Sequence, residues 1–230
     1  DSVACVVVGT PNFFGVVEDF TAIAGLVHHQ GALLITSSPE PLSLGLFKSP
    51  GEMGADIAVA EGQGFGNALN FGGPLLGLFA TRREFVRAMP GRLVGETVDT
   101  DGTRGFVLTL ATREQHIRRE RATSNICTNV ALCSLAATIT LALWGRGGFE
   151  KLARINYQTA ARLKERLAKI PGFKIRFGGT NFNGFAIELP QPADSVLEKL
   201  RAEKILGGIA LERWYPELKK CGALNEISLR

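Results

Sequence analysis

The sequence predicts an α/β protein with a mainly parallel sheet, followed by a smaller α+β domain. In the first part of the chain, short apolar runs alternate with amphipathic stretches and with breaks at glycine or proline, which is typical of parallel α/β architecture. After the glycine-rich segment at 145–148 the composition changes, and a charged amphipathic helix begins. We therefore expect a large domain over residues 1–148 and a small domain over residues 149–230.

The elements of the large domain follow from local periodicity and from turn residues. A buried strand is expected at 3–8, and a helix at 15–30, where apolar residues recur at helical spacing. Further strands are expected at 32–36, 55–60 and 75–80, and a short helix at 83–89.

A hairpin and a long apolar helix complete the large domain. Asp101-Gly102 is a typical hairpin turn and lies between two short strand-like pieces within residues 97–105. Residues 126–145 carry no charge over about a membrane-spanning length, and Thr123 or Ser124 is the expected N-cap. Polar residues interrupt this segment, so we interpret it as the central helix of a soluble domain.

The small domain is predicted to begin with an amphipathic helix at 149–170, which has aliphatic residues on one side and charges on the other. Two strands at 173–177 and 185–189 follow, then a helix at 195–204 and further short strands. This order of elements predicts a small α+β domain.

Composition places the chain among ordinary globular proteins. A chain of 230 residues with 45% hydrophobic residues is long and apolar enough to bury a sizeable core, which argues against intrinsic disorder. The formal net charge is only +4 and the basic residues are spread along the chain, so no nucleic-acid partner is expected.

The cysteines and histidines suggest neither a disulfide scaffold nor a metal site. The cysteines lack CxxC spacing, so we expect buried thiols in a reducing compartment. No histidine stands in an HxxxH or HExxH relation to another, so no metal is assigned. These residues are Cys5, Cys127, Cys133, Cys221, His28, His29 and His116.

Both ends of the sequence look like cuts through a larger protein. The chain starts at Asp1, directly before the first strand, and stops at Ile227-Ser228-Leu229-Arg230 inside an expected strand. We therefore expect a fragment that lacks its N-terminal portion and its C-terminal tail, with no signal peptide to remove.

The glycine-rich segment at 62–73 is the first candidate for a binding loop, since such loops after a strand can wrap phosphate. It matches neither GxGxxG nor GxxxxGK[ST], because Leu69 stands in place of the third glycine. We interpret the segment as close backbone packing. There is also no GxSxG elbow. Cys127, near an expected helix start, could be a reactive thiolate, but its apolar surroundings favour a packed cysteine.

A basic run at 113–121, REQHIRRER, precedes the long helix. Such a run is commonly a solvated or subunit-facing surface, and two glutamates partly neutralise it. It leads directly into Thr123-Ser124-Asn125, where free N–H groups at a helix start favour an anion. The sequence therefore predicts half of a phosphate site at these three residues.

Several segments together resemble subunit 1 of two-chain glycine decarboxylase, the glycine cleavage system P-protein. This subunit is of the type that corresponds to the N-terminal half of the enzyme. The resemblance covers nearly the whole chain and is most specific from Gly91 to Asn129. The segments are VVVGTPNFFGVVEDF at 6–20, GADIAVAEGQ at 54–63, FGGPLLGLFAT at 71–81, and GRLVGETVDTDGTRGFVLTLATREQHIRRERATSNICTN at 91–129.

The resemblance implies an aspartate-aminotransferase-like fold, the type I fold of transferases that depend on pyridoxal phosphate (PLP). In such an enzyme a lysine should follow the strand after Asp56, but Glu61-Gly62-Gln63-Gly64 stands there. An aspartate should face the pyridine nitrogen near Ser37, and no carboxylate stands in Ser37-Ser38-Pro39. We therefore expect PLP to be held covalently by a homologous second subunit, in a heterodimer or a dimer of heterodimers.

The activity implied by the resemblance is that of glycine dehydrogenase (aminomethyl-transferring), an oxidoreductase. It decarboxylates glycine and passes the aminomethyl group to the lipoyl arm of H-protein. Thr123, Ser124 and Asn125 resemble a turn that contacts the partner's PLP phosphate in trans. His116, Arg118 and Arg119 could line the substrate channel, and a structural role for them is an equal alternative.

Two other functions remain open from the sequence. The chain could be a stand-alone PLP enzyme, such as a cysteine desulfurase or an aminotransferase, or a non-catalytic scaffold with a degenerate PLP-enzyme fold. The missing lysine argues against the first. The expected location is the cytoplasm of a bacterium or archaeon, or the mitochondrial matrix of a eukaryote, with no membrane partner.

Overall fold

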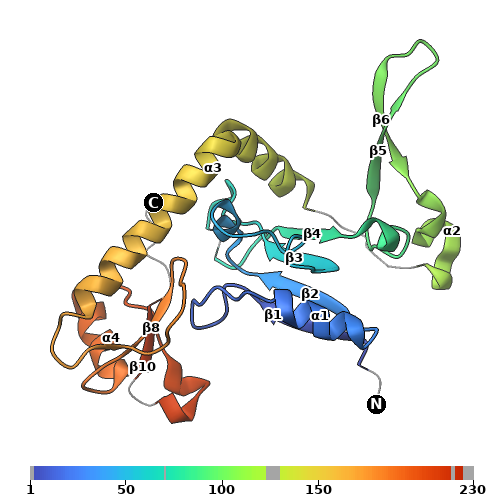
Figure 1. The fold of residues 1–230 in the computed structure, drawn as a ribbon. Helices are drawn as coiled ribbons and strands as arrows, with labels where there is room; N and C mark the ends of the chain where they lie inside the picture. The colour runs from blue at the N-terminus through green and yellow to red at the C-terminus, as the bar shows by residue number, and fades with distance from the viewer. Residues whose placement is uncertain (1–2, 70, 123–129, 219–220, 225–230) are drawn as a thin grey trace.

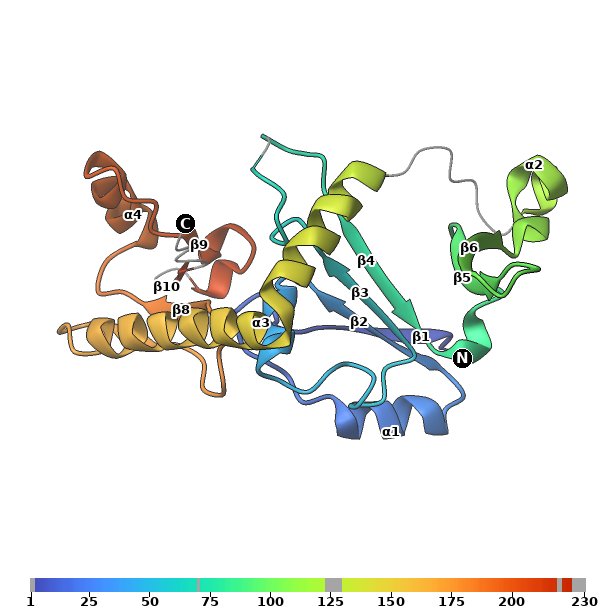
Figure 2. The same cartoon turned by 90° about the horizontal axis from the view of Figure 1, so that it is seen from above.

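The computed structural model describes residues 3–69, 71–122, 130–218 and 221–224. It contains a four-stranded sheet with helices packed against it, a small C-terminal domain, and a two-stranded ribbon that projects from the body (Figure 1). The view from above in Figure 2 shows the ribbon and the C-terminal domain at opposite ends of the large sheet.

The large sheet has the strand order β1-β2-β3-β4. The first three strands are parallel, and β4 runs antiparallel to β3. The predicted α/β class with a mainly parallel sheet is therefore confirmed. The strands are β1 (Cys5–Gly9), β2 (Leu33–Ser38), β3 (Ile57–Glu61) and β4 (Gly77–Thr81).

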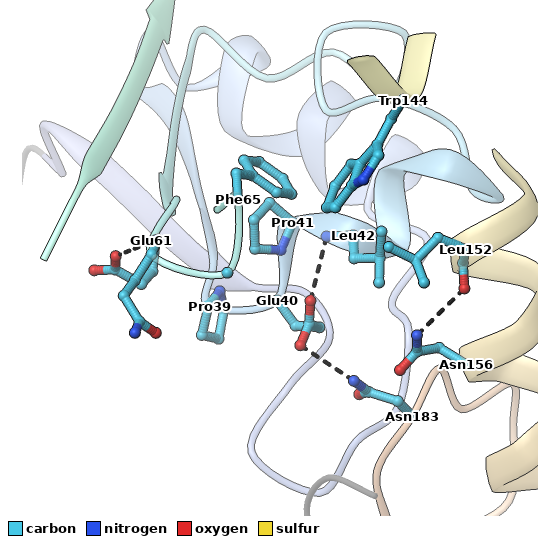
Figure 3. A pocket seen from close by; sticks show the side chains of 12 residues that line it. Pro39, Glu40, Pro41, Leu42, Glu61, Phe65, Trp144, Leu152, Asn156 and Asn183 are labelled. Atoms are coloured by element: carbon cyan, nitrogen blue, oxygen red, sulfur yellow. Dashed lines mark hydrogen bonds between the residues drawn. The ribbon is translucent and has the colours of Figure 1, made fainter. Parts of the chain in front are cut away.

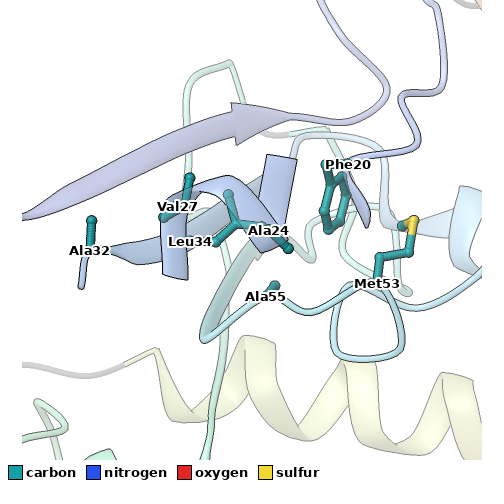
Figure 4. Close-up of a cluster of buried hydrophobic side chains, with 7 residues drawn as sticks. All are labelled: Phe20, Ala24, Val27, Ala32, Leu34, Met53 and Ala55. Carbon is teal, nitrogen blue, oxygen red and sulfur yellow. The ribbon is translucent and has the colours of Figure 1, made fainter. Parts of the chain in front are cut away.

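The core of the large domain lies between the sheet and α1 (Thr21–His29). Figure 4 shows the side chains of Phe20, Ala24 and Val27 directed toward Leu34 of β2. Phe20 and Leu34 are fully buried. Burial of an apolar side chain of this size stabilises a fold by about 1.5–3 kcal/mol, so this cluster anchors α1 to the sheet.

The helix expected at 15–30 is shorter, because its first six residues are not helical. Val16 forms a β-bridge with Asn181, and the N–H of Val17 donates to the carbonyl of Thr180 at 2.8 Å. These contacts with the C-terminal domain hold the segment extended. Tertiary pairing has therefore overridden the helical spacing of its apolar residues.

β1 is not the fully buried strand that was expected. Its alternate residues are exposed, including Val7 at 62%. In the described part of the chain β1 is an edge strand, and α1 covers only one of its faces. The prediction of a buried thiol is therefore wrong for Cys5, which is exposed, and confirmed for Cys133. The side chains of Cys127 and Cys221 lie outside the described residues.

α3 (Ala131–Leu167) is one long helix where two were expected. It contains a kink at Gly145, whose φ of 56° and ψ of −178° are not helical. Its N-cap position is Val130, with no side-chain cap, and the expected caps Thr123 and Ser124 lie outside the described residues. By length and composition alone, α3 is also apolar enough to cross a membrane.

The two halves of α3 belong to different cores. In the first half, Cys133 and Ala137 pack in one cluster with Phe65. In the second half, Leu163 and Leu167 pack against the C-terminal sheet. The expected domain boundary at residues 148–149 falls inside this helix, a few residues after the kink.

The C-terminal domain has a sheet in the order β7-β8-β10-β9, with α4 and the second half of α3 packed on it. β8 pairs antiparallel with both of its neighbours. This antiparallel sheet with its two helices is the small α+β domain that was predicted. Its elements are β7 (Lys174–Ile175), β8 (Phe185–Glu188), α4 (Ala193–Ala202), β9 (Ile209–Ala210) and β10 (Cys221–Leu224).

The ribbon consists of β5 (Leu93–Val98) and β6 (Arg104–Thr109), paired antiparallel. The predicted hairpin is confirmed, with Asp101-Gly102 between its strands. The helix expected at 83–89 is a short 3₁₀ turn instead. The short helical segments are η1 (Pro41–Gly45), η2 (Arg83–Phe85), η3 (Ala111–Arg113), α2 (Gln115–Arg118), η4 (Arg119–Arg121), η5 (Leu211–Arg213) and η6 (Pro216–Leu218).

Candidate functional site

A cavity of about 230 Å³ lies where β2 and β3 end, and its walls come from both sheet loops, α3 and the C-terminal domain. Open α/β sheets bind ligands in the crevice outside the carboxyl ends of their parallel strands. The position of this cavity therefore makes it the candidate site of the chain. Its lining residues are Pro39, Glu40, Pro41, Leu42, Glu61, Gln63, Gly64, Phe65, Trp144, Leu152, Asn156 and Asn183.

Aromatic rings form one wall of the cavity, and a carboxylate and an amide form another (Figure 3). The rings of Phe65 and Trp144 meet edge to face with 6.2 Å between their centroids. The carboxylate of Glu40 accepts a hydrogen bond from Nδ2 of Asn183 at 3.1 Å and one from the N–H of Leu42 at 3.3 Å. The bond to Asn183 joins the large domain to the C-terminal domain across the cavity.

Glu61 closes the glycine-rich loop at the end of β3. Its Oε1 accepts hydrogen bonds from the N–H of Gln63 at 2.8 Å and from the N–H of Leu76 at 3.0 Å. The N–H of Gly62 donates in turn to the carbonyl of Leu76 at 2.6 Å. Hydrogen bonds to an ionised carboxylate are stronger than neutral ones, so the two ends of the loop are held together.

The cavity lining does not fit pyridoxal phosphate. That cofactor needs a lysine for its Schiff base and cations or N–H donors for its phosphate. Gln63 lines the cavity in the segment where the Schiff-base lysine was expected. None of the twelve lining residues is Lys, Arg or His. The carboxylates of Glu40 and Glu61 would also repel a phosphate. These residues include no nucleophile for covalent catalysis either.

Ser37, where an aspartate was expected to face the pyridine nitrogen, lies at the carboxyl end of β2. Ser37 pairs with Gly9 on one side and with Val59 on the other, so it stands at the carboxyl end of β2 beside the end of β3. A serine cannot supply the negative charge that pairs with a protonated pyridine nitrogen. Both positions that lack the required groups therefore lie toward the carboxyl ends of β2 and β3.

The glycine-rich loop packs directly against α3, as the packing interpretation predicted. Gly66 has a φ of 82°, and a Cβ added there would lie 2.0 Å from Oγ1 of Thr140. Only glycine combines this conformation with so close an approach. The described part of the loop is therefore a packed wall of the cavity.

The other predicted site residues do not reach this cavity or are not described. Thr123, Ser124 and Asn125 lie outside the described residues, so their phosphate contact stays a prediction. His116 and Arg118 are exposed on α2, and Arg119 is exposed in η4. β4 is antiparallel to β3, so β4 ends at the end of the sheet opposite to the cavity. The chain continues from there into the ribbon and α2 (Figure 2).

The sequence-based predictions missed the residues that enclose the cavity from α3 and from the C-terminal domain. Trp144 and Asn156 flank the kink of α3, and Asn183 precedes β8. They are more than 100 residues from Glu40 in sequence, so no local pattern links them. Glu40 itself had a usable signal, since it is a carboxylate just after the predicted strand end at Ser38-Pro39.

A separate group of charges lies at the amino end of β3. Asp56, 3% exposed, accepts from the N–H of Leu34 at 2.7 Å, and its carboxylate lies 2.8 Å from Nε2 of His28 and 2.9 Å from Nη1 of Arg82. Burial alone would raise the pKa of Asp56, but these three partners outweigh burial and lower that pKa below its ordinary value. This cluster ties α1 to the sheet. Neither here nor elsewhere among the described residues do three His, Cys, Asp or Glu side chains gather as a metal site.

Comparison with known proteins identifies close relatives. The family model described as "Glycine cleavage system P-protein" matches residues 1–228. The chain is 58% identical over 216 residues to a "Probable glycine dehydrogenase (decarboxylating) subunit 1" of Parvibaculum lavamentivorans, covering 94% of this chain and 48% of that protein. A protein of the same description from Rhodospirillum centenum is 57% identical over 216 residues, with the same coverage. The chain thus spans about half the length of the curated relatives it matches.

Solved structures give the same result for the fold. A crystal structure of glycine decarboxylase (P-protein) of the glycine cleavage system, in inhibitor-bound form, superimposes with a TM-score of 0.91 at 41% identity, over 99% of this chain and 52% of that one. A cysteine desulfurase from Escherichia coli superimposes with a TM-score of 0.63 at 15% identity, over 96% of this chain and 54% of that one. The fold of type I PLP-dependent enzymes is therefore confirmed.

Proposed function

Because the chain belongs to the glycine cleavage system P-protein family, we propose that it is part of a glycine dehydrogenase (aminomethyl-transferring) whose pyridoxal phosphate is held by a second, homologous subunit. The complete enzyme decarboxylates glycine and passes the aminomethyl group to the lipoyl arm of H-protein. This chain by itself is inactive, and its cavity is the cofactor-free counterpart of the partner's active site.

The observation that carries this proposal is the lining of the cavity. It lies at the carboxyl ends of the parallel strands, where open α/β sheets bind ligands, yet its lining contains two carboxylates and no lysine, arginine or histidine. Hydrogen bonds to the carboxylate of Glu61 hold the two ends of the loop after β3 together. A stand-alone PLP enzyme built on these residues would have no group to hold the cofactor covalently, so the partner's site must do the chemistry.

In the partner, the cofactor supplies the electron sink that decarboxylation of an amino acid requires. In this chain, Thr123, Ser124 and Asn125 offer backbone and hydroxyl donors to the partner's phosphate. His116, Arg118 and Arg119 line the channel, where positive charge attracts the carboxylate of the incoming glycine. The location proposed for the complex is a reducing compartment, the cytoplasm of a bacterium or archaeon or the mitochondrial matrix of a eukaryote, which suits the free thiols of Cys5 and Cys133.

The test uses the full-length subunit that contains this chain, with and without its second subunit. The complex is reduced with borohydride and digested, and the peptides that carry the reduced cofactor are identified by mass spectrometry. We expect one pyridoxyl group per pair of subunits, on a lysine of the second subunit only. A modified lysine in this chain would overturn the proposal.

Activity provides the second readout. Glycine–bicarbonate exchange is measured for each subunit alone and for the mixture, with lipoylated H-protein present. We expect exchange only from the mixture. If the second subunit alone exchanges as fast as the mixture, this chain is a scaffold and the proposed role is wrong.

A further inference from the structure

A second cavity, of about 170 Å³, lies between the second half of α3 and the segment 179–182, which precedes β8. It shares no described lining residue with the cavity at the ends of β2 and β3. Its volume is below the roughly 300 Å³ at which typical ligand pockets begin, so only a small ligand fits. This space is called the α3 cavity below.

The wall of the α3 cavity at 179–182 is fixed by the large domain. The N–H of Val17 donates to the carbonyl of Thr180 at 2.8 Å, and the N–H of Phe182 donates to the carbonyl of Gly15 at 3.3 Å. The side chain of Phe182 is also fully buried. A wall that is already ordered lowers the entropic cost of binding a ligand.

The α3 cavity contains one positive charge, the ammonium group of Lys164. This half-buried group donates a hydrogen bond to Oδ1 of Asn181, and within the described residues it forms no ion pair with a carboxylate. An ammonium group can donate more than one hydrogen bond, so a ligand can accept another. Its neighbours one turn away along α3 carry no charge: Ala160, Ala161, Leu167 and Ala168.

Neutral donors surround this charge. Asn181 is 9% exposed, and its Nδ2 has no acceptor among the described residues. The hydroxyl groups of Thr180 and Tyr157 also line the cavity, and neither makes a hydrogen bond within the described part of the chain. None of the described lining residues is Asp or Glu. A cation with amide and hydroxyl donors and no nearby acid favours an anionic ligand.

The remainder of the lining is apolar and limits which anion fits. Inorganic phosphate would place oxygen atoms against these side chains without hydrogen bonds, which costs free energy, whereas an organic carboxylate places its carbon atoms there. An ammonium group on the ligand would be repelled by Lys164, so a zwitterion such as glycine fits poorly. The apolar surface comes from Ala160, Ala161, Phe182, Phe185 and the ring of Tyr157.

We infer that the α3 cavity binds a small organic carboxylate that carries no ammonium group. The carboxylate accepts hydrogen bonds from Lys164 and Asn181, and the carbon chain lies against Ala161 and the ring of Tyr157. That ring packs edge to face on Phe47, with 6.4 Å between the centroids, which fixes its position. The site goes beyond the proposed function, which does not use it.

The experiment titrates the full-length subunit with butyrate by isothermal titration calorimetry at constant ionic strength. Inorganic phosphate and glycine are titrated in the same way. We expect butyrate to bind with one site per subunit and a dissociation constant of about 1 mM, as suits a ligand with few non-hydrogen atoms. Phosphate and glycine should bind at least about 10-fold more weakly.

Three variants locate the site. Lys164→Met removes the charge and keeps a similar shape, so the affinity for butyrate should fall by about 10-fold or more. Ala161→Leu fills the cavity and should abolish binding, which gives a second test if the first variant does not fold. Arg162→Met removes the same charge from an exposed position of α3 that does not line the cavity, and should change the affinity by less than about 2-fold. Thermal unfolding checks that each variant is folded.

Four results would overturn the inference. They are no saturable binding of butyrate to the wild-type subunit, binding of phosphate or glycine as tight as that of butyrate, unchanged affinity in Ala161→Leu, and equal losses in Lys164→Met and Arg162→Met. The last result would show that the general positive charge of α3 attracts the anion. None of these measurements needs the second subunit or the exchange reaction, so this inference and the proposed function fail separately.

Discussion

The carboxylate of Glu61 accepts the N–H of Leu76 at 3.0 Å across the whole glycine-rich loop, which brings together two residues that are 15 positions apart. The same Oε1 accepts the N–H of Gln63. One side chain therefore holds both ends of the loop that follows β3.

Replacement of Glu61 by Ala should loosen this loop. Two backbone N–H groups lose a charged acceptor, so we expect the full-length subunit to lose about 2–3 kcal/mol of unfolding free energy. Hydrogen exchange at Gln63 and Leu76 should become faster, while Glu61→Gln, which keeps an acceptor oxygen, should retain most of the protection. The exposed Glu84→Ala is the control. Unchanged exchange in Glu61→Ala would contradict the assigned role.

Stability in acid should depend on Asp56. A carboxyl group whose pKa is lower in the folded state stabilises the fold at pH values above its unfolded pKa of about 3.9, and this stabilisation is lost as the pH falls through the folded pKa. We expect Asp56→Asn to lower the unfolding free energy by about 2 kcal/mol at pH 7 and to flatten the decline below pH 4. Urea unfolding at a series of pH values measures both effects. A variant with the same acid decline as the wild type would show that Asp56 does not cause it.

Gly66 and Gly64 form a matched pair in the same loop. A Cβ on Gly66 meets Oγ1 of Thr140 at 2.0 Å and forces a side chain into a positive φ, whereas nothing lies within 4 Å of a Cβ on Gly64. We expect Gly66→Ala to cost about 3 kcal/mol, since strain and overpacking add, and Gly64→Ala to be nearly neutral. Thermal unfolding compares them directly. Equal melting temperatures would argue against the close packing of this loop on α3.

Gly145 and Gly147 should respond to alanine in opposite directions. Gly145 has a backbone conformation that side chains avoid, so Gly145→Ala should destabilise the subunit by about 1–3 kcal/mol. Gly147 is helical and has open space around it, so Gly147→Ala should stabilise by about 0.5–1 kcal/mol. If both substitutions stabilise, the helix runs straight through residue 145 in solution.

Local patterns in the sequence predicted most of the elements in the large sheet. The strands β2 and β3 have apolar runs bounded by turn residues, and the ribbon has an Asp-Gly turn, so each carries its own signal. The start of α1 and the exposure of β1 were predicted wrongly. Both depend on residues distant in sequence. The start of α1 depends on the pairing of Val16 with Asn181, and the exposure of β1 depends on which elements cover the faces of the sheet.

The candidate site was predictable only in part. The strand ends predicted from the sequence place Ser37 near the end of β2 and Gln63 just after β3, and Gln63 lines the cavity. The cavity beside Gln63 is completed by Trp144, Asn156 and Asn183; Trp144 and Asn156 lie on either side of the kink of α3 at Gly145. The bend in α3 and the approach of these distant segments depend on tertiary packing. Local sequence patterns did not predict them.

Residues of α3 pack in the cores of both domains, so one helix connects the two domains. Loss of packing around Leu163 would detach the second half of α3 from the C-terminal sheet. The direction of the helix after the kink at Gly145 would then no longer be fixed by that sheet. The first half, which holds Cys133 against Phe65, is weakened by the same event. A disturbance of either core is therefore expected to reach the other through the helix that they share.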